Sequence, residues 1–318
     1  NHARLSVFFN HAPVYAGTIS GEGSFEKSGN GTLTLQGVQT YTGGTVVSFG
    51  SLILGGNDRL AASGALTVNG GIFNLNGFSQ TVGDLSGYGQ LAIGTGSLTV
   101  GGSANTGFSG AINGSGAFAK QGSGTLTITG NKAFTGTTTV NAGTLRVDGS
   151  MAASAFQVNA GGTLRGNGSG GAATVANGGT LAGSAGSTLN MASLTLSGTS
   201  NVAVALGAPG VTPLFNVTGA LTLDGRLIVT DAGGFGSGVY RIIDYGGALT
   251  DNGLDVATMP GGTTGSVQTA IANQVNLVVG GSVTPIPAIQ FWNGDTTVAN
   301  GTVNGGPGTW TAAGTANW

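Results

Sequence analysis

Residues 114–149 read GSGAFAKQGSGTLTITGNKAFTGTTTVNAGTLRVDG, and residues 21–56 read GEGSFEKSGNGTLTLQGVQTYTGGTVVSFGSLILGG. The two segments align without a gap, and about half of the 36 paired positions are identical. Self-similarity of this kind is typical of a chain built from one recurring structural unit. The repeat is therefore the starting point for the fold.

Each copy consists of very short strands. The segments TLTL at 32–35 and TLTI at 125–128 alternate a hydroxyl with an aliphatic side chain, which is the period of a strand buried on one face. Gly pairs and Asn-Gly steps supply the turns that end such runs. A single copy cannot bury its row of Leu and Val, whereas stacked copies can. The sequence therefore predicts an all-β solenoid with little or no helix.

The shared unit also resembles a known family. It reads G-x-G-x-[FL]-x-K-x-G-x-G-T-L-T-L-x-G, followed by [YF]-T-G-x-T-x-V, and it resembles the passenger-associated transport repeat of bacterial autotransporters. The two copies cover roughly a quarter of the chain. The resemblance implies a right-handed parallel β-helix, type V secretion and display on the outer membrane of a Gram-negative bacterium. It also implies that the only membrane contact is a C-terminal β-barrel, which we expect outside this sequence.

The composition agrees with many short strands separated by tight turns. The 318 residues include 65 glycines and no cysteine, and only 6% are charged. Glycine has no triplet period, which excludes collagen, and the aliphatic alternation is too regular for a disordered chain. The lack of cysteine means that the fold does not use disulfides. A net charge of −2 without a basic patch argues against nucleic acid as a partner.

Neither end of the sequence reads as the end of a protein. Asn1 is not an initiator methionine, and Trp318 falls within an apparently unfinished repeat. No apolar run reaches the roughly 18 residues that a membrane-spanning helix needs. We therefore expect a segment of a longer surface protein.

A proline-containing stretch divides the chain. We predict a β-helical passenger segment over 1–280 and a linker over 281–290, GSVTPIPAIQ. Residues 291–318 then begin a further module or form a C-terminal cap, because large aromatic rings suit the cover of an open core. All three tryptophans lie in this last part: Trp292, Trp310 and Trp318. A sugar-binding aromatic cluster is the alternative reading of these rings.

The length of the repeating unit changes along the predicted passenger segment. The copies start 93 residues apart, which fits about four rungs of roughly 20–25 residues. After the second copy the unit shortens, with Val158 and Val175 separated by 17 residues. Strands lengthen over 201–250, and Asp251-Asn252-Gly253 suggests a hairpin turn.

Two polar patterns predict stacking between rungs. Asn74 and Asn76 recur at turn positions, where amide side chains can form hydrogen-bonded ladders. Threonine recurs in T-x-T rows such as 125–129, and Thr137, Thr138 and Thr139 are consecutive. Regular T-x-T faces occur on flat ice-binding surfaces, but the rows do not recur at every rung. Threonine is better explained as a β-branched residue that points outward from a strand.

Few residues are suited to catalysis or metal binding. His2 and His11 are the only imidazoles, and with no cysteine and sparse carboxylates they do not form a metal site. No G-x-S-x-G elbow lies in a strand–turn–helix pattern, so a serine hydrolase is not indicated. Neither the calcium-binding nonapeptide nor a phosphate-binding loop occurs. We predict no catalytic, cofactor-binding or metal residues, and no cofactor.

Carboxylates are the best candidates for a polysaccharide-processing enzyme, which would need a close pair of them. Asp224, Asp231 and Asp244 fall within about one rung of each other. Asp148 and Asp224 are each followed by glycine and are better explained as turn formers. We therefore expect that the chain is not an enzyme.

The function that these observations favour is structural and adhesive. We expect a surface-exposed passenger segment that acts as a rigid stalk or adhesin, with host surface molecules or another copy of itself as partners. Few charges mean little self-repulsion, so self-association is compatible with the sequence. Two alternatives stay open: a polysaccharide-processing enzyme on a β-helix, and a spacer with no ligand.

Overall fold

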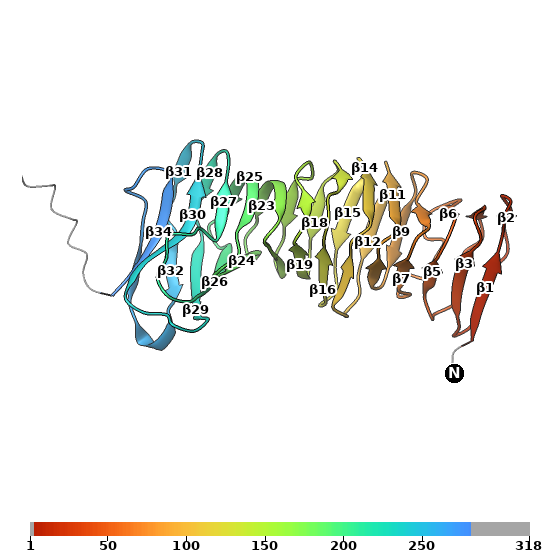
Figure 1. Ribbon diagram of the computed structural model, residues 1–318, viewed down its shortest axis with the longest axis horizontal. Helices are drawn as coiled ribbons and strands as arrows, with labels where there is room; N and C mark the ends of the chain where they lie inside the picture. The colour runs from red at the N-terminus through yellow and green to blue at the C-terminus, as the bar shows by residue number, and fades with distance from the viewer. Residues whose placement is uncertain (1–2, 281–318) are drawn as a thin grey trace, which may run out of the picture. The chain divides into compact units, whose positions relative to one another are not determined.

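The computed structural model describes residues 3–280, which form a parallel β-solenoid (Figure 1). The chain visits its sheets in turn, so that a strand pairs with the strand one coil later. Within the described residues no α-helix occurs, and the only helical element is the short 3-10 turn η1 (Pro260–Gly262). The predicted all-β solenoid is confirmed. His2, the predicted linker 281–290 and the predicted module 291–318 with its tryptophans lie outside the described residues.

Three sheets form the sides of the solenoid, and we call them A, B and C. Sheet A consists of β1 (Arg4–Phe8), β3 (Ser24–Ser28), β5 (Thr45–Val47), β7 (Leu66–Val68), β10 (Leu85–Gly87), β13 (Thr106–Phe108), β16 (Thr125–Ile128), β19 (Gly143–Val147), β22 (Gly162–Gly166), β24 (Thr180–Ser184), β26 (Asn201–Leu206), β29 (Arg226–Asp231) and β32 (Asp255–Thr258). Sheet B consists of β2 (Val14–Tyr15), β4 (Thr32–Leu35), β6 (Ser51–Leu54), β8 (Ile72–Asn74), β11 (Gln90–Gly94), β14 (Ala111–Gly114) and β17 (Ala133–Phe134). Sheet C consists of β9 (Ser79–Val82), β12 (Ser97–Val100), β15 (Ala117–Lys120), β18 (Thr138–Val140), β20 (Ser150–Met151), β21 (Phe156–Val158), β23 (Ser169–Val175), β25 (Leu189–Leu196), β27 (Phe215–Val217), β28 (Leu221–Leu223), β30 (Gly238–Tyr245), β31 (Leu249–Asp251), β33 (Gly265–Gln268) and β34 (Gln274–Val279).

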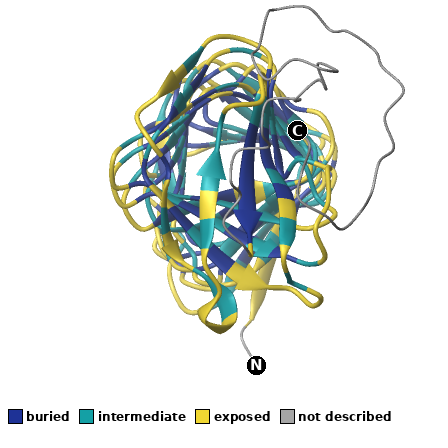
Figure 2. Ribbon diagram, turned by 90° about the vertical axis from the view of Figure 1, so that its left-hand side faces the viewer, coloured by how far each residue is buried: buried dark blue, intermediate teal, exposed yellow. Residues whose placement is uncertain are grey.

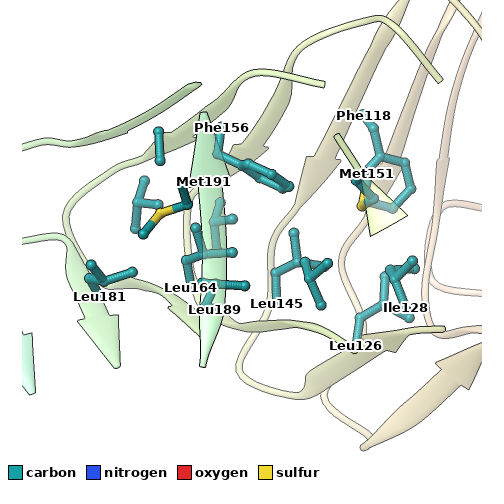
Figure 3. Close-up of a cluster of buried hydrophobic side chains, with 14 of the residues drawn as sticks. Phe118, Leu126, Ile128, Leu145, Met151, Phe156, Leu164, Leu181, Leu189 and Met191 are labelled. Atoms are coloured by element: carbon teal, nitrogen blue, oxygen red, sulfur yellow. The ribbon is translucent and has the colours of Figure 1, made fainter. Parts of the chain in front are cut away.

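Inward side chains form columns through the stack, and the buried residues lie inside the coils (Figure 2). One column on sheet A pairs residues in register and exposes at most 1% of each: Leu126, Leu145, Leu164 and Leu181. Phe118, Phe156 and Met191 enter the same interior from sheet C (Figure 3). Burial of each such side chain is worth about 1.5–3 kcal/mol. Stacking therefore buries rows that one coil would leave in water.

Glycine lines the corner that leads from sheet A to sheet B. A Cβ on Gly110 would overlap the carbonyl oxygen of Gly89 in the preceding coil, and a Cβ on Gly50 would overlap that of Gly31. Only a residue without a side chain lets successive coils approach this closely at the corner. The corner from sheet B to sheet C has its own glycine column: Gly96, Gly116 and Gly136.

The two repeat copies sit on different faces of the solenoid. The strand with Leu33 is β4 in sheet B, whereas the matching strand with Leu126 is β16 in sheet A. Likewise Lys27 lies in sheet A and its counterpart Lys120 in sheet C. The offset of 93 residues is therefore not a whole number of coils, and the second copy is turned by one face relative to the first.

Sheet B ends at β17, and the faces of sheets B and C then merge. Strand β23 pairs with both β20 and β21, so one long strand replaces two short ones. The coil shortens at this point, because Val158 pairs with Val175 and Thr163 pairs with Thr180. The 17-residue spacing predicted from the sequence is confirmed, and its cause is the loss of one corner.

The last part of the described chain has longer strands, as expected. Strands β25 and β30 have 8 residues each, and β30 pairs antiparallel with β34. The predicted hairpin at Asp251-Asn252-Gly253 is wrong, since this turn joins β31 of sheet C to β32 of sheet A. The antiparallel hairpin lies instead between β33 and β34. Gly253 has a φ of 93°, and Asn273 beside β34 has a φ of 66°, so both turns use left-handed backbone.

The predicted asparagine ladder forms at other positions than Asn74 and Asn76. Coil-to-coil asparagine bonds join Asn141 to Asn159 at 2.7 Å and Asn190 to Asn216 at 2.9 Å. Asn76 bonds instead to Asn74 through its backbone N–H and to the carbonyl of Leu54 through its side chain.

Threonine does not always point outward. Thr45 and Thr138, which are equivalent in the two copies, are 2% and 0% exposed. The expectation that threonine rows skip rungs is also wrong for one column, because four outward threonines pair in consecutive coils: Thr125, Thr144, Thr163 and Thr180. No regular T-x-T face results, since the next column changes from Thr127 to Arg146 and Arg165.

Candidate functional site

An outward column on sheet A carries two arginines in adjacent coils. Arg146 of β19 pairs in register with Arg165 of β22, and the column continues through Ala182 and Ala203 to Ile228. These strands follow one another along one side of the stack (Figure 1). A bulky pair is thus followed by two small side chains, which leaves a depression in the surface.

The depression has a volume of about 340 Å³. Its lining combines the arginines, a floor of small residues and several hydroxyls: Arg146, Arg165, Gly166, Ala182, Gly183, Ser184, Ser187, Ala203, Val204, Ala205, Ile228 and Thr230. We call this surface the sheet A groove. The threonine column described above lies beside it, since Thr144 and Thr163 are two residues before the arginines on the same strands.

The electrostatics of the groove are positive. The Nε atom of Arg146 donates to Asp148 Oδ2 at 2.6 Å, which leaves its two terminal nitrogens unused by this ion pair. Arg165 is exposed, and among residues 3–280 no carboxylate lies within 4.0 Å of its guanidinium. Like charges placed opposite each other on paired strands disfavour folding. Asp148 offsets this repulsion at Arg146, whereas Arg165 has no such partner among the described residues.

A second hollow, of about 240 Å³, lies on sheet C beside β30. Its polar groups already bond to one another: Arg241 Nη1 donates to Asp244 Oδ1 at 2.9 Å and Arg241 Nε donates to Asn276 Oδ1 at 3.0 Å. Asn216, also in the lining, donates to Asn190 in the preceding coil. This network joins neighbouring strands and leaves few unpaired groups for a ligand.

The carboxylates weighed from the sequence have local partners. Asp224 accepts from the backbone N–H of Gly225 at 2.7 Å, and Asp231 accepts from that of Gly233 at 2.6 Å, as turn-forming aspartates do. Asp244 is paired with Arg241, as described above. In the described part of the chain no three His, Cys, Asp or Glu side chains gather as a metal site would require. Asp148 accepts from Arg146 and from the backbone of Asn167.

Of the two histidines, only His11 is described. Its ring packs edge-on against Phe9, with 5.5 Å between the ring centroids. In residues 3–280 no helix is long and apolar enough to cross a membrane.

Buried lysines have a structural role that the sequence did not reveal. Lys27 is 0% exposed, and its Nζ donates to the carbonyls of Ser28 and Gly29 at 2.8 Å each. Lys120, its counterpart in the second copy, donates to Gln121 and Gly122 in the same way. Desolvation lowers the pKa of both side chains, and for Lys120 the nearby Asp84 partly opposes this. The repeat's lysine thus satisfies turn carbonyls inside the corner.

A third buried lysine, Lys132, occupies the position of Gln39 in the first copy. It is 6% exposed and donates to three carbonyls, those of Ser109, Gly110 and Thr129. Its Nζ also lies 5.6 Å from the centre of the Phe108 ring. Burial lowers the pKa of Lys132 to about 8.

The two repeat copies match a known protein family. The passenger-associated-transport-repeat family matches residues 25–54 and 118–147, which lie within the two copies found above. Two such repeats on a parallel β-solenoid support an autotransporter passenger domain.

Part of the sequence is also similar to a particular adhesin. The chain is 46% identical over 143 residues to the adhesin BmaC autotransporter of Brucella suis biovar 1 (strain 1330). The match covers 44% of this chain and 4% of that protein.

Proposed function

We propose that this chain is part of the passenger of an outer-membrane autotransporter and serves attachment at the cell surface rather than catalysis. The observation that carries the proposal is the 46% identity over 143 residues to a protein named as an autotransporter adhesin. The parallel solenoid is compatible with this role, because stacked coils give a stiff support with long exposed faces. Partners are then host surface molecules or a second copy of the chain.

The mechanism is interfacial and mechanical. Each coil bonds to its neighbours through parallel ladders, so the solenoid resists bending and holds its outward columns in a fixed order. Because coils contact only their neighbours, folding can start at one end and proceed along the chain. Such folding outside the cell would favour export in one direction.

The proposal is tested by exchange rather than by simple deletion. In the longer protein that carries this chain, residues 3–280 are replaced by an unrelated β-solenoid with the same number of coils. We expect surface display to persist and attachment of the bacteria to host cells to fall several-fold. Display is measured with an antibody against a tag outside the exchanged segment.

The alternatives give other results in the same experiment. Unchanged attachment by the exchanged protein would mean that the segment is only a spacer. Clumping of bacteria that display the native segment, lost on exchange while host attachment stays, would identify a second copy as the partner. Release of sugars from polysaccharide by the purified chain would contradict the non-enzymatic role.

A further inference from the structure

The sheet A groove has a chemistry that matches one class of ligand. We propose that it binds an anionic polysaccharide whose sugars carry carboxylates, with one chain lying along the direction in which the coils stack. This inference rests on the proposed adhesive function and adds the ligand class to it.

The arginines supply the first part of the argument. Neighbouring parallel strands lie about 4.8 Å apart, so Arg146 and Arg165 can reach the same carboxylate or those of adjacent sugars. A guanidinium matches a carboxylate with two parallel hydrogen bonds, which a surface lysine cannot do. Asp148 holds Arg146 through Nε alone and so orients its terminal nitrogens.

The rest of the lining fits a sugar ring. Ala182, Ala203 and Ala205 make a small apolar floor, against which the C–H face of a pyranose can lie. Ser184 and Thr230 bring hydroxyls to its edge, and the threonine column continues beside the arginines. Sugar hydroxyls find both donors and acceptors among such side chains.

Other classes of ligand fit the groove less well. A peptide strand needs a free sheet edge, but β22, β24 and β26 each pair with strands on both sides. Nucleic acid needs a larger positive surface than two arginines with Asp148 beside them. The depression is floored by alanine and no aromatic side chain lines it, so it does not suit a large apolar anchor.

The test uses the full 318-residue chain and a defined probe. Binding of hexameric oligogalacturonate is measured by calorimetry and compared with that of neutral maltohexaose. We expect only the uronate to bind, and we expect Arg165→Gln to weaken it about tenfold, as the loss of a charge-assisted hydrogen bond would. Arg4→Gln is the matched control, because Arg4 is an exposed arginine of sheet A in β1, at the other end of the described sheet from the groove strands. It should leave the affinity unchanged.

A stability measurement separates a binding role from a folding role. Removing one of two adjacent like charges should leave the urea midpoint of Arg165→Gln unchanged or higher. Failure of oligogalacturonate to bind would overturn the proposal, as would equal binding of polyglutamate or tighter binding of sulfated maltohexaose. An equal loss of affinity in Arg4→Gln would also overturn it.

The outcome can be told apart from the fate of the adhesive function. If bacteria attach through this segment but Arg165→Gln attaches as well as the native protein, the ligand assignment fails and adhesion stands. If the purified chain binds oligogalacturonate but exchange of the segment leaves attachment unchanged, adhesion fails and the groove assignment stands.

Discussion

At the scale of single residues, the two repeat copies solve the same problem in two ways. Thr45 and Thr138 are equivalent, and both bring a hydroxyl into the core. In the first copy Tyr41 bonds to Thr45 Oγ1 at 2.6 Å. In the second copy Phe134 replaces the tyrosine, and Ser154 of the next coil bonds to Thr138 Oγ1 at 2.8 Å. The coil after the first copy has Gly64 where the coil after the second copy has Ser154, because the next residues, Ala65 and Ala155, accept the backbone N–H of Thr45 and Thr138 in the same way.

This exchange predicts a compensating pair of substitutions. Tyr41→Phe should lower the free energy of unfolding by about 1–2 kcal/mol, because a buried hydroxyl loses its partner. Adding Gly64→Ser should recover part of the loss, because its Cβ meets only a tight contact of 3.3 Å with the carbonyl oxygen of Ala61, which a small backbone shift relieves. Urea unfolding of the single and double variants measures the coupling. Strictly additive effects would contradict the explanation.

Tyr41 and Lys132 also make stability depend on pH in opposite directions. Burial raises the pKa of Tyr41 to about 12, so its contribution is present below pH 10 and is lost as pH rises toward 12. For Lys132 the unfolded value of 10.5 falls to about 8, so the folded state disfavours the charged form.

A pH series on Lys132→Gln isolates the lysine. The unfolded chain holds the Lys132 proton more tightly, so the native protein should gain stability between pH 8 and pH 10, by up to about 2 kcal/mol. Gln39 shows that glutamine fits this position, so the variant serves as the reference without the titrating group. The difference in urea midpoint between the two proteins should change over that range. A constant difference would mean that the ammonium is fully compensated by its three carbonyls.

At the scale of elements, the corners limit substitution more than the strands do. Gly110 lies in the corner between sheets A and B, where a Cβ would strike the carbonyl oxygen of Gly89. Gly110→Ala should therefore destabilise the chain by about 1–3 kcal/mol, as overpacking does.

The control for this substitution is a glycine in open space. Gly236 has no atom within 4 Å of an added Cβ and no left-handed backbone angle. Gly236→Ala should therefore change stability little, and the two variants can be compared by thermal unfolding. Equal effects would mean that close approach at the corner is not what selects glycine.

Much of this element-level structure could be predicted, and the failures have physical reasons. Alternation in TLTL and TLTI predicted strands because it reflects which side is buried, and the 17-residue spacing predicted a shorter coil. The inward Thr45 and Thr138 were missed, since their partners lie in other turns or coils. The hairpin was misplaced because Asp-Asn-Gly specifies a tight turn but not which sheet the chain enters next. The sheet A groove depends on the register of five strands, which periodicity does not provide.

At the scale of the molecule, different residues of each coil maintain the fold and face a partner. The inward columns and the glycine corners recur along the stack, whereas the outward columns differ from coil to coil. A surface such as the sheet A groove can change without disturbing the core, because its side chains point away from it. The solenoid therefore tolerates variation on the faces that meet a partner.

Matching strands of the two repeat copies lie in different sheets, and this offset affects how such a protein can vary. Recombination between the matching segments of the gene would remove 93 residues and leave a seamless unit at the junction. The shortened protein would also present its distal surfaces toward a different side, since the deleted piece is not a whole number of coils. A single recombination event would therefore change both the length of the solenoid and the direction in which the surfaces of all later coils face.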